Sequence, residues 1–304
     1  MEGVGFAVAA AVGFAFFNVL TQLGVKDSRI HPFTALFLNL TGGTVVLVVA
    51  VLLTGGISRE SWAWEGVWYF AAAGLITALA GQAALISSIP RIGATRASCF
   101  LLADNIVALI LGYFALGQTV STVSGIGILI LMTGAVLFIL ETAGSSNRVQ
   151  PQVRDTRRFL VGISMALLGA ICFATGGVLR GKGVAIMPAA IVGSAINIVA
   201  GLVAVTIVCA VRGRLRDPFA VGWKRGGFLL LSGVANAAGT LGFIMALQYG
   251  VTVAVTTALK NTSPLLTFAL AIPLLRRHER LSVRLGLLVC LVVAGAVLIA
   301  LGRL

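Results

Sequence analysis

Two charged side chains stand inside stretches of sequence that are otherwise uncharged and mostly apolar. Asp104 lies in "LLADNIVAL" (101–109), and Lys260 lies in "ALKNTSPLL" (258–266). An intramembrane charge costs about 2.5–3.5 kcal/mol on insertion scales, so it usually faces the interior of a helix bundle and serves a function. A buried ammonium group attracts a carboxylate, and a buried carboxylate binds an amine or exchanges a proton. We predict that both residues bind substrate in one cavity; the alternative is a permanent ion pair that only locks the helices together.

Amide side chains form a second group of candidates, because an unpaired amide in hydrocarbon is costly. A lone Ser or Thr in a membrane helix usually bonds its own backbone or a neighbour, which makes hydroxyl groups weaker candidates. The amides predicted to bind substrate are Asn18, Gln22, Gln82, Asn105, Asn197, Asn236 and Asn261.

Other residue types that carry chemistry are sparse or unsuitably placed. The two histidines, His31 and His278, lie at the edges of apolar stretches, and the four cysteines lie within such stretches without C-x-x-C spacing. The sequence holds no H-E-x-x-H motif, no phosphate-binding Gly-rich loop and no paired intramembrane aspartates. We therefore expect no catalytic residues, no metal site, no cofactor and no ATP-driven pumping by this chain alone.

The composition defines the class of protein in which these residues work. The chain of 304 residues is 59% hydrophobic and 10% charged, with a mean hydropathy of +1.07, which indicates a helical membrane protein. A net charge of +13 would suggest a nucleic-acid partner in a soluble protein. Here the basic residues fall mainly between apolar stretches, so membrane topology explains them better, and we expect no nucleic-acid partner.

The apolar stretches predict the fold. A bilayer core needs about 20 apolar residues per helix. The expected architecture is all-α, with ten transmembrane helices at 3–25, 31–54, 67–88, 92–116, 121–141, 159–180, 187–211, 227–248, 251–275 and 281–302. The polar and basic segment 143–158 separates five helices in 1–142 from five in 159–304.

The distribution of basic residues predicts the orientation. Most lysines and arginines lie in the segment 143–158 and in the connections 26–29, 212–225 and 276–284, whereas the opposite ends of the helices hold few. The positive-inside rule places the basic ends in the cytoplasm. Both termini then lie outside, in what we expect to be a bacterial inner membrane.

The two halves also resemble each other in sequence. "NVLTQLGV" (18–25) aligns with "GVLRGKGV" (177–184), and "SGIGILILMTGAVLFIL" (124–140) aligns with "RLGLLVCLVVAGAVLIA" (284–300), with an offset near 160. Because each repeat has an odd number of helices, the second must be inserted upside down relative to the first. Inverted repeats are a construction plan of secondary transporters and place the binding site near the midplane.

Three further features concern the shape and ends of the predicted helices. Pro264 lacks an N–H and frees the carbonyl of Lys260, which predicts a break beside the binding site. Arg96 is interpreted as an anchor that reaches the cytoplasmic interface. Arg180 and Lys182, within a Gly-rich helix end, are expected at the outer mouth, as a gate or as part of a closely packed helix.

The segments "GATRASCFLLADNIVALILGYFALGQTVSTVSGIGILILMTGAVL" (93–137) and "NTSPLLTFALAIPLLRRHERLSVRLGLLVCLVVAGAVL" (261–298) carry a family resemblance. Through them and the five-plus-five layout, the chain resembles the drug/metabolite transporter superfamily in its ten-helix, EamA-type branch. The resemblance implies this fold and the transport of amino acids, metabolites, sugars or drugs. The sequence departs from the family pattern in lacking a proline beside Asp104.

We therefore expect a secondary transporter, not an enzyme, that exports a small polar or amphipathic metabolite such as an amino acid by alternating access. The alternatives are a lipid or polyprenyl-carrier flippase of the same fold and a membrane-embedded enzyme. The expected partners are the lipid bilayer, the small-molecule substrate and coupled protons. Both a monomer and a homodimer fit the sequence.

Overall fold

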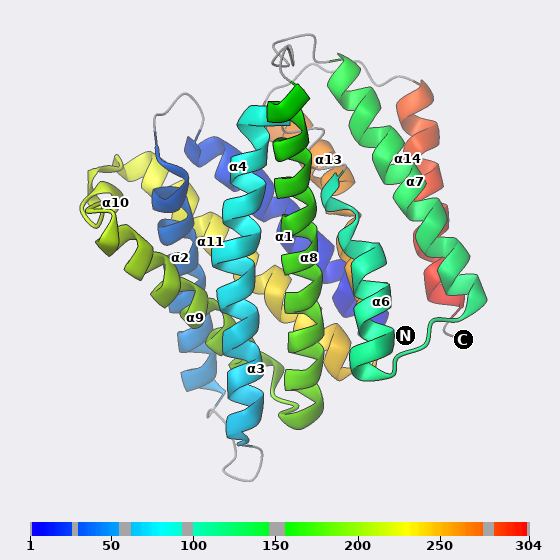
Figure 1. Cartoon of the computed structure of the whole chain (residues 1–304), viewed down its shortest axis with the longest axis horizontal. Helices are drawn as coiled ribbons and strands as arrows, with labels where there is room; N and C mark the ends of the chain where they lie inside the picture. Colours follow the sequence, from blue (N-terminus) through cyan, green and yellow to red (C-terminus); the bar gives the residue numbers. More distant parts are fainter. Residues whose placement is uncertain are drawn as a thin grey trace.

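A computed structural model describes residues 2–25, 30–54, 62–92, 100–145, 156–275 and 283–302. Every regular element within these ranges is a helix (Figure 1). Continuous apolar sequence favours this outcome, because in hydrocarbon a helix satisfies its backbone hydrogen bonds within a single segment.

The helices of the first half follow the apolar stretches closely. They are α1 (Glu2–Val25), α2 (Pro32–Leu53), α3 (Trp64–Leu75), the π-helix η2 (Ile76–Gly81), α4 (Gln82–Ile92), α6 (Asp104–Leu116) and α7 (Thr122–Ser145). The run from α3 through η2 to α4 is continuous, so a short π-helical segment lies inside one long helix.

The helices of the second half include one that is interrupted. They are α8 (Thr156–Ile186), α9 (Ala190–Val211), the short α10 (Asp217–Ala220), α11 (Trp223–Gln248), α12 (Val253–Lys260), α13 (Ser263–Leu275) and α14 (Val283–Leu301). Residues 261 and 262 form a turn between α12 and α13, and Pro264 lies at the start of α13. The break that Pro264 predicts therefore follows Lys260 directly.

Seven helices in the described part of the chain are long and apolar enough to cross a membrane. Two shorter apolar helices, Asp104–Leu116 and Leu287–Ile299, accompany them. An integral membrane protein follows from these lengths and compositions, while the count of ten spans and their inversion stay predictions.

Small side chains lie mainly inside the bundle and large apolar side chains lie on its surface, as expected in a lipid environment. The buried interior is rich in small residues such as Ala7, Ala11 and Ala170, whereas large apolar side chains such as Leu53 and Phe114 are more than three-quarters exposed. Small residues let the helices approach closely, and large apolar ones suit contact with lipid tails.

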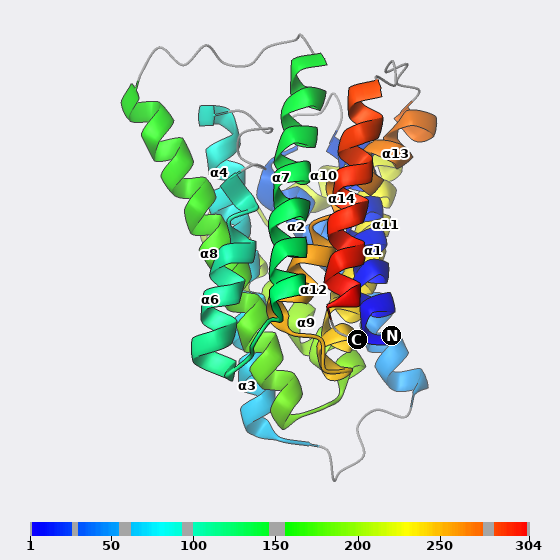
Figure 2. The same cartoon turned by 90° about the vertical axis from the view of Figure 1, so that its right-hand side faces the viewer.

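The two ends of the bundle differ in charge. Figures 1 and 2 place α10, the end of α4 and the start of α8 toward one end, and both termini with the turn after α6 toward the other. The first end, which we term the basic end, carries Arg91, Arg157, Arg158, Arg212, Arg214, Arg216, Lys224 and Arg225. This clustering is the pattern from which the orientation is predicted.

Candidate functional site

Asp104 and Lys260 lie against each other, which makes them the centre of the candidate site. Lys260 Nζ donates to Asp104 Oδ2 at 3.0 Å, and Asn261 Nδ2 donates to Asp104 Oδ1 at 2.7 Å. Asp104 is the first residue of α6, and Lys260 is the last residue of α12. We term these three residues the ion-pair cluster; each comes from a helix end and not from the middle of a regular helix.

The two charges of the ion-pair cluster are not equally accessible. The side chain of Asp104 is 2% exposed and that of Lys260 is 21% exposed. Both carboxylate oxygens of Asp104 accept a hydrogen bond from within the protein. The ammonium group has three donors and remains partly accessible, so it can bind a second anion or exchange one for another.

Asn105 follows Asp104 in the chain, and half of its amide is satisfied. Its Nδ2 donates to the carbonyl of Leu102 at 3.2 Å, whereas its Oδ1 is buried and has no hydrogen-bond partner among the described residues. A buried oxygen of this kind calls for a donor. Asn105 can therefore accept from an N–H or O–H group of a bound molecule.

A second polar cluster surrounds Arg180 of α8. Its Nη2 donates to Asn197 Oδ1 at 3.2 Å and to Thr77 Oγ1 at 3.4 Å, and its guanidinium lies 5.6 Å from the centre of the Phe243 ring. Asn197 is held in turn, because its Nδ2 donates to the carbonyl of Phe70 at 3.1 Å. We term Arg180, Thr77, Asn197 and Phe243 the arginine cluster.

The other predicted amides are dispersed. Asn236 donates to Asn39 Oδ1 at 3.0 Å, and Asn18 donates to Thr267 Oγ1 at 3.3 Å. Gln82 is partly buried at the start of α4, and Gln22 is exposed on α1. The structure thus brings Asp104, Lys260 and Asn261 together with Asn105 next to them, and it places the remaining candidates elsewhere in the bundle.

Two polar residues make contacts that the sequence did not predict. Arg180, expected at the outer mouth, is partly buried and contacts groups of η2, α9 and α11. Asn39 was not among the candidates, yet it is 3% exposed and bonds both Asn236 and Ser232. The sequence does contain a signal for Asn39, since Asn197 follows it by nearly the repeat offset. Arg96 lies outside the described residues.

The two clusters lie at different depths along α8. A Cβ on Gly169 would meet Leu101, and one on Gly181 would meet Leu116, so α6 and α8 run side by side in the same direction. Asp104 follows Leu101 by less than one turn. Arg180 therefore lies roughly 12 Å farther along α8 than Asp104, at 1.5 Å per residue, and on the side away from the basic end.

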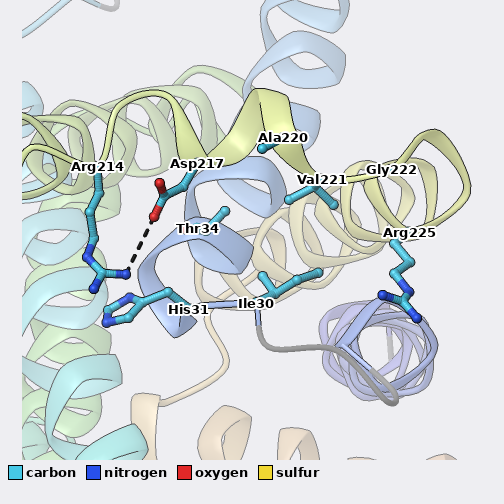
Figure 3. A pocket seen from close by; sticks show the side chains of 9 residues that line it. All are labelled: Ile30, His31, Thr34, Arg214, Asp217, Ala220, Val221, Gly222 and Arg225. Carbon is cyan, nitrogen blue, oxygen red and sulfur yellow. Dashed lines mark hydrogen bonds and ion pairs between the residues drawn. The ribbon is translucent and has the colours of Figure 1, made fainter.

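A separate pocket of about 280 Å³ opens at the basic end, between the start of α2 and α10 (Figure 3). Arg214, Asp217, Arg225 and His31 line it, and Arg214 pairs with Asp217 at 3.5 Å. Burial, followed by the nearby Arg214 and Arg212, lowers the pKa of His31. Because this pocket lies at the basic end of the bundle and contains no residue of the ion-pair cluster, we do not assign it to transport.

Comparisons with known proteins agree with this architecture. The sequence profile of the EamA-like transporter family matches residues 1–140 and 160–301. One solved crystal structure of a protein superposes with a TM-score of 0.71 at 17% sequence identity, and the match covers 96% of each chain; at that identity the likeness concerns the fold. No curated protein matches the sequence.

Proposed function

Because the chain belongs to the EamA-like transporter family, we propose that it is a secondary transporter that exports a small polar or amphipathic metabolite, such as an amino acid, by alternating access. The proposed setting is a bacterial inner membrane, with the linker 143–158 in the cytoplasm and both termini outside. The observation that carries the proposal is the ion pair between Asp104 and Lys260.

The packing of the helices supports two inverted five-helix repeats, 1–142 and 159–304. If a pseudo-two-fold axis relates the halves, α8 corresponds to α1, α9 to α2, and α11 to the helix that begins with α3. α1 packs on α11, and its counterpart α8 packs on α3; α2 packs on α11, and its counterpart α9 packs on α3. α7 and α14 also correspond, and they pack against each other. The pseudo-two-fold axis would therefore exchange the two helices of this pair.

Two backbone crossings support the same symmetry. Gly74 faces the carbonyl of Asn197, and Gly233 faces the carbonyl of Asn39, so closely that a Cβ at either glycine would strike the oxygen. Asn39 and Asn197 are 158 positions apart, and Gly74 and Gly233 are 159 apart, as in the sequence repeat. The contact of Gly74 with Asn197 and the contact of Gly233 with Asn39 therefore have the same form, as expected if a two-fold axis relates the two halves.

The ion pair joins the two repeats where their corresponding helices are interrupted. Residues 102 and 103 form a turn before α6, and residues 261 and 262 form a turn after α12. Interrupted helices in corresponding positions of two repeats are typical of transporter binding sites near the midplane. The pair can therefore form in one conformation and be replaced by contacts with substrate in another.

We assign a role to each residue of the ion-pair cluster. Lys260 binds an anionic group of the substrate in place of Asp104, because its ammonium group is the accessible partner. Asp104, once released, binds an amine or takes up a proton, which would couple transport to a proton gradient. Asn105 Oδ1 and Asn261 supply hydrogen bonds beside them. A permanent ion pair that only locks the bundle is the competing structural role.

Neutralising the pair singly and together distinguishes these roles. Lys260→Met or Asp104→Asn leaves one buried charge unpaired, which costs about 3–5 kcal/mol of stability, and we expect both variants to lose transport. The double variant removes both charges and should recover most of the stability while remaining inactive. Purified protein is first screened by thermal shift against amino acids, organic acids and nucleosides, and a stabilising solute is then used for counterflow in proteoliposomes.

The exposed pair Arg214–Asp217 provides the matched control, and Arg214→Gln with Asp217→Asn should leave both stability and counterflow close to wild type. Transport that persists in Lys260→Met, or that returns in the double variant together with stability, would show that the pair only locks the bundle.

A further inference from the structure

Arg180 is a cation inside the bundle whose partners are all uncharged. Its contacts are the hydroxyl of Thr77, the amide oxygen of Asn197 and the ring of Phe243. Asp104 is paired with Lys260 and Asp217 with Arg214, so neither of these carboxylates neutralises Arg180. An ionisable residue at this depth is normally paired, and one that is not is a candidate for binding a charged ligand.

The guanidinium also retains donor capacity. It has donors on all three nitrogens, and both of its hydrogen bonds come from Nη2. Nε is buried and has no hydrogen-bond partner among the described residues. A buried, unused donor on a cation is costly to leave unsatisfied, and a planar oxyanion such as a carboxylate is the group that arginine binds best.

The partners of Arg180 are arranged to hold it and not to neutralise it. The Thr77 hydroxyl donates to the carbonyl of Ala73 at 2.8 Å, so it accepts from Arg180. Asn197 donates to the carbonyl of Phe70, which turns its oxygen toward the guanidinium. Thr77 belongs to η2, and π-helical segments inside α-helices occur frequently at functional sites.

The other repeat builds the same crossing without a charge. There Asn39 bonds Ser232 at 2.9 Å and Asn236 at 3.0 Å, next to the contact of its carbonyl with Gly233. The sequence repeat places Thr21 where the second half has Arg180. Because amides and a serine are enough to hold this crossing, packing alone does not account for the arginine.

These observations deepen the proposed transport function and rest on it. We propose that Arg180, Thr77 and Asn197 form a second binding site for the carboxylate of the transported solute, which the solute occupies at a different step from its contact with Lys260, on the side of the ion-pair cluster away from the basic end. The substrate class is then a carboxylic acid or an amino acid. One guanidinium among uncharged groups balances a single negative charge, which favours a carboxylate over a phosphate dianion.

The test compares carboxylates with their own amides. Purified protein in detergent is heated with L-leucine or leucinamide, L-phenylalanine or phenylalaninamide, and succinate or succinamide. At least one carboxylate should raise the Tm of the wild type more than its amide does. Arg180→Gln should abolish that difference, and Arg180→Lys, which keeps the charge without the planar donor set, should weaken the apparent affinity about tenfold. Arg216→Gln, an exposed arginine at the basic end, should behave as wild type.

Each outcome decides the proposal. It is overturned if no carboxylate exceeds its amide in the wild type, or if Arg180→Gln retains the difference. If Arg180→Gln does not yield monodisperse protein, Arg180→Lys decides, and wild-type affinity in that variant overturns the proposal.

Counterflow separates this site from the transport function itself. Counterflow of an amide that is unchanged in Arg180→Gln would support transport and contradict the carboxylate site. A carboxylate-dependent shift in Tm without counterflow of any solute would support the site and contradict transport.

Discussion

Asp104, which is buried, and Arg180, which is partly buried, are satisfied in different ways. Asp104 accepts from a charged and an uncharged donor, and the result is a neutral cluster. Arg180 donates only to uncharged groups, and a net positive charge remains.

The sequence identified Asp104 and Lys260 as candidates, because a charged residue in an apolar segment usually faces the interior of a helix bundle. The contacts of Arg180 were not predicted, because α8 continues to Ile186, beyond its expected end at residue 180.

The protonation of a single residue, His31, leads to a prediction about the pH dependence of stability. His31 caps α2, with Nδ1 accepting from the backbone N–H of Phe33 at 3.4 Å. Burial and the arginines lower its pKa, with Asp217 partly opposing them. The unfolded chain then binds the proton more tightly than the folded protein, so the free energy of unfolding should fall as the pH drops below about 6.5 and stay level above it.

His31→Asn keeps a capping acceptor without the proton, and it should remove this pH dependence. The measurement is Tm from pH 5 to pH 8 for both proteins. Equal slopes below pH 6.5 would show that His31 does not cause the effect.

Interruptions of regular α-helix lie next to Asp104 and Lys260 and include Thr77. Pro264 made the break between α12 and α13 predictable, since a proline removes a backbone donor and disfavours helix continuation. Nothing comparable marks η2: "ITALAG" holds no proline, and η2 packs against α8 and α9. Local sequence can therefore predict a break that is caused by backbone chemistry, but not one that is caused by tertiary packing.

The two similar backbone crossings predict that substitution of the glycine in either one lowers stability by a similar amount. Gly74→Ala and Gly233→Ala would each press a methyl group onto a carbonyl oxygen that cannot move without shifting a helix. Overpacking of this kind costs about 1–3 kcal/mol, so both variants should unfold at a lower temperature. Gly125→Ala in α7 is the control, because a Cβ there meets nothing within 4 Å. A loss of stability equal to that of the control would show that the helices can separate at no cost.

At the scale of the whole molecule, the bilayer restricts the fold more than the sequence details do. Spans follow from length and apolarity, and helix occupies most of the described residues of each expected stretch, with turns at 102–103 and 261–262. Which helix packs on which was not predictable, because small residues are spread through many of the helices and permit several pairings. The assignment of α1 to α11, and of α8 to α3, required the structure.

The predicted orientation can be tested at two exposed positions on opposite ends of the bundle. In a background without cysteine, Pro188→Cys follows α8 and Arg216→Cys precedes α10. A membrane-impermeant maleimide should label the first in intact cells and the second only after permeabilisation. The reverse pattern would place the basic end outside and would contradict the predicted orientation.

The presence of arginine in one repeat and threonine in the other affects the energetics of the proposed cycle. Two identical halves would give inward-facing and outward-facing states of equal energy. A single off-centre charge removes that degeneracy, because the membrane voltage acts on it with about 2.3 kcal/mol per elementary charge per 100 mV. If Arg180 moves through even part of the field between the two states, the resting potential favours one orientation of the empty carrier. Transport in one direction is then faster than transport in the other.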